Sequence, residues 1–112
     1  MMSVAEKVGI PPKLLYETIS ASQATTVSGL FKELGKRIAA DEYDNPTFQV
    51  DLLSKDVTLA VQMARQAGAA PVITDITQKM NERAQSSGLG NRDTSEMWKL
   101  WRELPVSLTS RL

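Results

Sequence analysis

The sequence of 112 residues contains no cysteine and no histidine. The lack of cysteine excludes disulfide bonds and thiolate chemistry, so we expect a protein of the reducing cytoplasm. The lack of histidine removes the commonest metal ligand and the commonest general base near neutral pH. We therefore predict no metal site, and any catalytic group has to come from other residue types.

The chain also lacks an excess of either charge and lacks long apolar runs. Its 13 lysines and arginines balance 13 aspartates and glutamates, whereas nucleic-acid binders usually carry a basic excess. No run approaches the roughly 18 apolar residues that a membrane helix needs. Glu6 and Lys7 interrupt the N-terminal segment, which therefore does not resemble a secretory signal. We expect neither nucleic acid nor a membrane as a partner.

Prolines and glycines divide the chain into blocks whose apolar residues have helical spacing. Val4 and Val8 precede Gly9 and predict the end of a helix whose start is not visible, and Pro12 can occupy the first turn of a second helix. Three further blocks each place their apolar residues on one stripe. These stripes are Val27, Leu30, Phe31, Leu34 and Ile38; Val50, Leu53, Val57, Ala60, Val61 and Ala64, ended by Gly68; and Ile73, Ile76, Met80 and Ala84, after Pro71.

A last helix is predicted after Asp93, which can form a capping box with Glu96. Its apolar face consists of Met97, Leu100, Trp101 and Leu104, and Pro105 prevents its extension. We expect Trp101 in the core. For Trp98, partial burial against a neighbouring helix and an exposed binding anchor both stay open. Because no alternating strand pattern occurs, the sequence predicts an all-α fold, a bundle of five to six helices in a single domain over residues 1–112.

Lys55 and Asp56 attract attention because of their position relative to the apolar stripe. At about 100° per residue, Asp56 lies roughly 60° from Leu53, at the edge of the stripe, whereas Lys55 lies roughly 160° away. The spacing predicts that the two side chains do not form one surface ion pair and that Asp56 lies near the core. Lys55 is then either solvated or directed at a group that this chain does not contain.

Four motifs occur in order along the chain. They are Ala5-Glu6-Lys7-Val8-Gly9-Ile10 with the segment Leu14 to Ser22; Phe48 followed by Lys55-Asp56-Val57-Thr58-Leu59-Ala60; Gly68 with Pro71; and Gly88-x-Gly90-x-x-Asp93-x-Ser95. Together they resemble the C-terminal domain of the 3-hydroxyisobutyrate dehydrogenase family. These β-hydroxyacid dehydrogenases are related to 6-phosphogluconate dehydrogenase, so the resemblance implies a helical bundle like the C-terminal domain of that enzyme.

The resemblance implies an NAD(P)-dependent oxidoreductase acting on CH–OH donors. In such an enzyme this domain forms one wall of the cofactor and substrate cleft and makes subunit contacts. The lysine of the family's Lys-Asp pair contacts the nicotinamide end of the cofactor, and this role maps onto Lys55. The substrate-cleft positions map onto Phe48 and Asp56. For Phe48, a hydrophobic anchor at the start of a helix remains an open alternative.

The family's Rossmann domain and its catalytic lysine would lie upstream of this chain, which resembles a fragment starting partway down the interdomain helix. We therefore assign no catalytic residue here and expect the chain alone to be inactive, with no tightly bound NAD or NADP. We expect a homodimer, because an apolar groove left open is typically covered by self-association. The alternative is a non-enzymatic helical oligomerisation or interaction module. Substrate choice and the choice between NAD and NADP are not encoded in this part.

Overall fold

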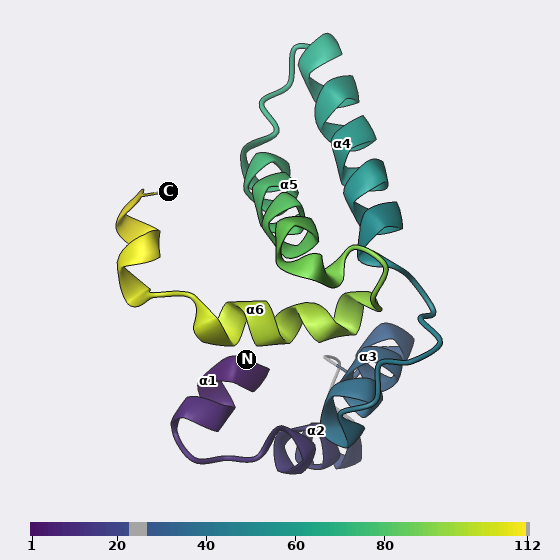
Figure 1. Cartoon of the computed structure of the whole chain (residues 1–112), viewed down its shortest axis with the longest axis vertical. Helices are drawn as coiled ribbons and strands as arrows, with labels where there is room; N and C mark the ends of the chain where they lie inside the picture. The colour runs from purple at the N-terminus through teal and green to yellow at the C-terminus, as the bar shows by residue number, and fades with distance from the viewer. Residues whose placement is uncertain (23–26, 112) are drawn as a thin grey trace. The chain divides into compact units, whose positions relative to one another are not determined.

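The computed structural model describes residues 1–22 and 27–111, and most of these residues are helical (Figure 1). Within these ranges the β pairing is limited to one isolated antiparallel bridge, between Gln49 and Asp93. The predicted all-α fold is confirmed. None of the described helices combines the length and the apolar content of a membrane span. The α-helices are α1 (Met2–Lys7), α2 (Pro12–Ala21), α3 (Gly29–Ala40), α4 (Val50–Gln66), α5 (Val72–Ala84) and α6 (Trp98–Glu103).

The helices belong to two compact units. The first contains α1, α2, α3 and α6, and the second contains α4 and α5. A π-helical turn, Gln85–Leu89, continues α5. A 3₁₀ helix, Thr94–Met97, precedes α6, and another, Val106–Arg111, follows it. The apolar spacing in the sequence does not predict these short segments.

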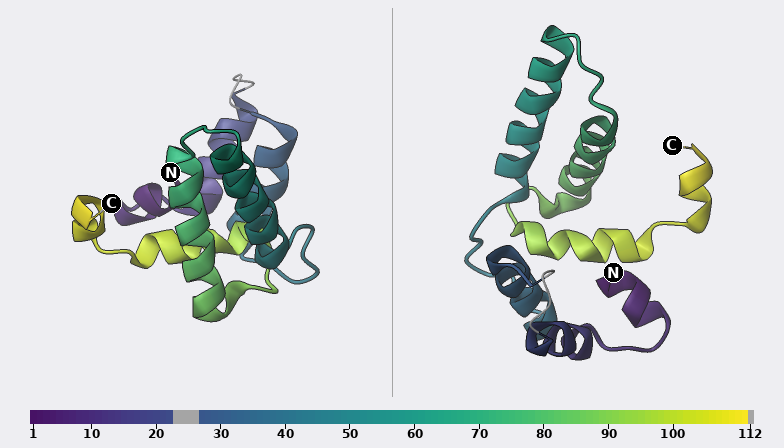
Figure 2. Two further views of the ribbon diagram at one scale, coloured as in Figure 1. Left: turned by 90° about the horizontal axis from the view of Figure 1, so that it is seen from above. Right: turned by 180° about the vertical axis from the view of Figure 1, so that it is seen from behind.

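In the first unit, α2 and α3 lie side by side, and α1 contacts both α2 and α6 (Figure 2). Gly35 of α3 allows the close approach of α2, because a Cβ atom there would lie 2.7 Å from Cδ2 of Tyr16. The Tyr16 ring also stacks on Phe31, with the ring centroids 5.9 Å apart. One small residue and one aromatic pair thus set the spacing of the two helices.

The second unit is a helical hairpin in which α4 and α5 pack antiparallel (Figure 1). The chain turns between them at Gly68, whose φ of +76° is in the region that favours glycine. Val50 and Val61 of α4 are fully buried, and Met80 and Ala84 of α5 are also buried, as their stripes predict.

Ile73 and Ile76 belong to the same predicted stripe of α5 but are not buried, since they are 79% and 37% exposed. Spacing along a helix shows which residues share a face. It does not show whether another helix covers that face at a given turn. In this hairpin the buried part of α5 is its second half, around Met80 and Ala84.

The last helical segment begins at Thr94, directly after Asp93, and α6 ends at Glu103 before Pro105, as predicted. The roles of the two tryptophans need a correction. Trp101 is exposed rather than in the core, whereas Trp98 is half-buried and its Nε1–H donates to the Tyr43 hydroxyl at 2.7 Å. The segment begins as a 3₁₀ helix, with a different number of residues per turn, and buried Tyr43 supplies an acceptor for Trp98. Partial burial is thus confirmed for Trp98.

Candidate functional site

Lys55 and Asp56 lie on α4, and both side chains are well exposed, at 63% and 56%. Lys55 Nζ is 3.4 Å from Asp56 Oδ1, so the prediction that the two do not form one surface ion pair is wrong. The expectation that Asp56 lies near the core is also wrong. Neighbouring residues of a helix point about 100° apart, but the flexible four-carbon stem of lysine is long enough to bridge that angle. An exposed pair of this kind stabilises a fold by only about 0–1 kcal/mol.

A second apolar stripe surrounds this ion pair on the outward face of α4. Leu52, Leu59 and Met63 are between 45% and 69% exposed. At about 100° per residue, Leu52 lies roughly 60° and Leu59 roughly 40° from Lys55. We call Leu52, Lys55, Asp56, Leu59 and Met63 the outward face of α4. The sequence reasoning missed its apolar members, although their spacing of i, i+7 and i+11 is the same helical signal that identified the buried stripe.

Phe48 lies just before α4, and the residue is 37% exposed. Its backbone amide and its backbone carbonyl both form hydrogen bonds. The amide nitrogen donates to Asp93 Oδ2 at 3.4 Å, and the carbonyl oxygen accepts a hydrogen bond from Thr94 N at 2.9 Å. The ring is therefore presented from a fixed segment. Its role as a cleft residue stays a prediction, as does the alternative role of a hydrophobic anchor.

The Gly88-x-Gly90-x-x-Asp93 motif forms the loop that caps the start of α4. Val50 N donates to Arg92 O at 3.0 Å, and Asp51 N donates to Gly90 O at 2.8 Å. These bonds occupy two of the amide groups that the first turn of a helix leaves without partners. Gly88 has a φ of +86°, which explains the glycine at that position. The motif therefore holds the helix that carries Lys55.

The outward face of α4 has the side chains of a ligand-binding surface. It offers one ammonium group, one carboxylate and exposed apolar side chains. In the part of the chain that the structure describes, no three potential metal-ligating side chains of the His, Cys, Asp or Glu type gather in one place. The lysine can hold an anionic or carbonyl oxygen of a ligand, and the leucines can cover an apolar ring.

Comparison with known proteins identifies the family. The profile of the family described as "NAD-binding of NADP-dependent 3-hydroxyisobutyrate dehydrogenase" matches residues 1–101. The chain belongs to this family. It is 26% identical over 110 residues to 2-(hydroxymethyl)glutarate dehydrogenase of Eubacterium barkeri, an alignment that covers 93% of this chain and 36% of that protein. The resemblance derived from the four motifs is confirmed.

The fold has a solved counterpart. The crystal structure of 3-hydroxyisobutyrate dehydrogenase from Salmonella typhimurium matches with a TM-score of 0.78 and 24% identity, over 88% of this chain and 34% of the dehydrogenase. Both of these similar proteins are dehydrogenases by name, and this chain spans about a third of the length of each. The structural likeness shows the helical fold, and the family rests on the profile match over residues 1–101. Neither match addresses the individual roles of Lys55, Asp56 and Phe48.

Proposed function

We propose that this chain is the helical domain of an NAD(P)-dependent β-hydroxyacid dehydrogenase and that the outward face of α4 forms one wall of its cofactor and substrate cleft. The observation that carries the proposal is the exposure of the Lys55–Asp56 pair among apolar side chains. A charged pair within exposed apolar surface is a common feature of binding surfaces. The proposal also draws support from the family to which the chain belongs.

The residues of this face suit a nicotinamide cofactor. An ammonium group is a compact donor for the phosphate or carboxamide oxygens of such a molecule, and Leu52 and Leu59 offer apolar contact for a ring. Bound NAD or NADP supplies a carrier for hydride. Within that cleft Lys55 binds and orients the cofactor, Asp56 holds the lysine in place, and Phe48 helps to exclude water.

Most of the length of each similar dehydrogenase lies outside the match with this chain. In the family, the nucleotide-binding glycine-rich turn and the catalytic lysine lie in that other part. We therefore propose that residues 1–112 alone have no dehydrogenase activity and bind NAD(P) only weakly, and that a Rossmann domain is the partner against which this wall closes.

An NMR titration of the chain with NADH tests the proposed wall. At concentrations up to about 10 mM, a ligand with millimolar affinity (about −4 kcal/mol of binding free energy) gives measurable shifts. We expect these shifts at the amides of Lys55, Asp56 and their neighbours on the outward face of α4. K55A should weaken binding about tenfold, the value of one charge-assisted hydrogen bond. K79A alters an exposed lysine on α5 and is the matched control.

Three outcomes of this titration count against the proposal. The first is the absence of shifts on α4 at the highest NADH concentration. The second is an equal effect of K55A and K79A, which would indicate non-specific attraction to any lysine. The third is micromolar affinity in a calorimetric titration, which would contradict the expectation that tight binding needs the Rossmann domain.

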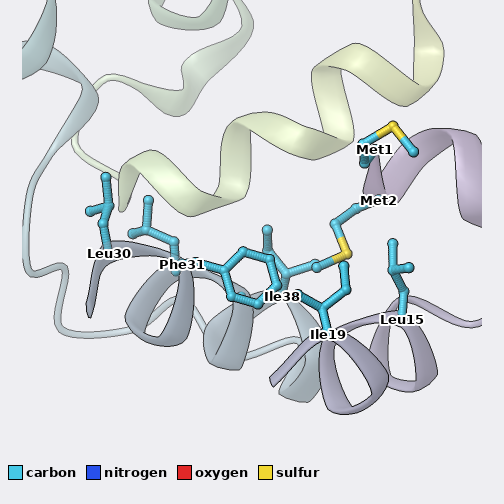
Figure 3. Close-up of a pocket in the computed structure, with 9 residues that line it drawn as sticks. Met1, Met2, Leu15, Ile19, Leu30, Phe31 and Ile38 are labelled. Carbon is cyan, nitrogen blue, oxygen red and sulfur yellow. The ribbon is translucent and has the colours of Figure 1, made fainter. Parts of the chain in front are cut away.

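We also propose that the chain forms a homodimer through an apolar groove of the first unit. The groove has a volume of about 310 Å³, and in Figure 3 Met2 of α1 points toward Ile19 of α2 and Ile38 of α3. Exposed apolar side chains gathered in one groove are surface that a second copy of the chain could cover. A C₂ dimer would place the same groove on both copies. The groove is lined by Met1, Met2, Leu15, Ile19, Leu30, Phe31, Leu34, Gly35 and Ile38.

The charge-introducing variant L30E should convert this dimer to a monomer, because it places a carboxylate in the groove. Leu30 is exposed, so the change should leave the helical content intact. L14E is the control, since Leu14 is an exposed leucine of α2 that does not line the groove. Light scattering gives the mass and circular dichroism gives the helicity.

A monomeric wild type at high concentration, or equal effects of L30E and L14E, would rule out the groove as the dimer interface. A dimer without any NADH-induced shift on α4 would instead favour the alternative function, a helical oligomerisation module without enzymatic role.

A further inference from the structure

We propose that Asp93 is a positioning residue for the cleft wall: its buried carboxylate fixes the backbone of Thr47 and Phe48 and so sets the Phe48 ring at the start of α4. The proposal rests on the proposed function in one respect, namely that Phe48 belongs to the cleft. The hydrogen bonds that carry it are independent of that assumption.

Asp93 is a buried residue whose carboxylate forms hydrogen bonds with a distant segment of the chain. Its side chain is completely inaccessible to solvent, and a buried charged group is stable only when hydrogen bonds compensate for the lost hydration. Two consecutive amide groups from a segment more than forty residues away provide such bonds. Thr47 N donates to Oδ2 at 2.8 Å, and Phe48 N donates to the same oxygen at 3.4 Å. The carboxylate thus holds a distant part of the chain.

Phe48 is held through a second backbone atom as well. Besides the bond from its amide to Asp93, its carbonyl accepts a hydrogen bond from Thr94, the residue after Asp93. Both polar backbone atoms of Phe48 are therefore bonded to the same two-residue stretch. The residue is nevertheless 37% exposed. An exposed aromatic side chain on a backbone held at both ends is pre-organised to contact a ligand.

We call the hydrogen bonds of Asp93 and Thr94 with Thr47 and Phe48 the clamp. The clamp is connected to the helix that carries Lys55. The residues that precede Asp93 bind the first turn of α4, through Val50 N to Arg92 O and Asp51 N to Gly90 O. Phe48 comes seven residues before Lys55 in the sequence, on the segment that leads directly into this helix. One loop therefore sets both the aromatic residue and the helix that carries the lysine. This gives the aspartate of the motif a role beyond the predicted helix cap.

Fluorine NMR can test the clamp, because the chain has only two phenylalanines, Phe31 and Phe48. In protein labelled with fluorophenylalanine, Phe31 of the first unit serves as the internal reference. We expect D93N to move the Phe48 resonance toward the position of the free amino acid and to leave the Phe31 resonance unchanged. Amide hydrogen exchange of Thr47 and Phe48 should accelerate at least about tenfold.

The matched control is M80A, which removes a buried side chain of α5 and destabilises the same unit without removing a hydrogen bond between Asp93 and Thr47 or Phe48. In the folded M80A protein the Phe48 resonance should stay where it is in the wild type. A folded D93N protein with a wild-type Phe48 resonance overturns the proposal. So does a change of equal size in D93N and M80A, because that would indicate general loosening.

Two further measurements keep the test decisive if D93N fails to fold. D93E retains the charge but moves the carboxylate by one methylene group, and it too should displace the Phe48 resonance. In the wild type, the Thr47 amide should be protected from exchange, and exchange at the rate of an unfolded chain would overturn the proposal without any variant.

A titration with NADH separates this proposal from the proposed function. If the function is right, NADH shifts both the Lys55 amide and the Phe48 fluorine in the wild type, and in D93N the Phe48 shift is lost while the Lys55 shift remains. If NADH shifts neither residue in the wild type, the proposed function fails. The displacement of the Phe48 fluorine resonance in ligand-free D93N still tests whether Asp93 positions Phe48.

Discussion

Replacing Gly90 by alanine should destabilise the chain by about 1 kcal/mol, the value of the exposed hydrogen bond that Asp51 would lose. The backbone is not the cause, since Gly90 has the right-handed helical angles φ −53° and ψ −45°, which any residue adopts. The cause is Asp51, because a Cβ atom on Gly90 would lie 2.5 Å from its Oδ1 atom. To avoid it, Asp51 would have to leave Gln85, whose Nε2 donates to that oxygen at 2.7 Å.

Urea denaturation followed by circular dichroism measures this effect, and Gly29→Ala is the control. A Cβ on Gly29 would meet no atom within 4 Å, so this change should be neutral or stabilise α3 by up to about 1 kcal/mol. Combining Gly90→Ala with Asp51→Ala removes the clash, so the double variant should unfold at nearly the same free energy as Asp51→Ala alone. Purely additive losses in this cycle would show that Asp51 is not the cause.

The positions of the helices could be predicted because their signals are local. Pro12 begins α2, Gly68 lies in the turn after α4, and Pro105 follows α6. Each of these residues acts through its own backbone conformation, which is independent of the rest of the fold. The buried stripe of α4 could be predicted for the same reason, since residues three and four apart share a face.

The candidate site could be predicted only in part. The motifs located Lys55, but spacing alone misjudged its ion pair with Asp56, because side-chain length and rotation are not encoded in a helical period. Spacing also assigned Trp101 to the core. The hydroxyl of Tyr43, which holds Trp98, comes from a residue more than fifty positions away. The long-range partners of Asp93 were invisible for the same reason.

Tyr43 should make the stability of the chain fall at alkaline pH. Burial of the phenol raises the pKa of Tyr43 to about 12 from the ordinary 10.0. The hydrogen bond from Trp98 lowers this pKa, and the negative charges of Asp41 and Glu96 raise it. The folded chain thus holds this proton more tightly than the unfolded chain does. Its contribution to stability is complete below about pH 10 and disappears as the pH rises through about 12. A shift of this size corresponds to at most about 3 kcal/mol.

Urea denaturation of the wild type and Y43F at neutral and alkaline pH isolates this contribution, because the other groups that titrate there are the same in both proteins. At pH 7, Y43F should lose about 1–3 kcal/mol, since it leaves the Trp98 Nε1–H without its acceptor. Its stability should then fall less than that of the wild type at alkaline pH, so the two curves converge.

Y16F is the control. The hydrogen bond that it loses, from the Tyr16 hydroxyl to Lys32 O at 3.2 Å, is at an exposed site. The loss of stability at pH 7 should therefore stay below about 1 kcal/mol, and the fall in stability at alkaline pH should persist. Parallel curves for wild type and Y43F would mean that the Tyr43 phenol is hydrated in solution. The hydrogen bond between Tyr43 and Trp98 of α6 would then be open to water as well.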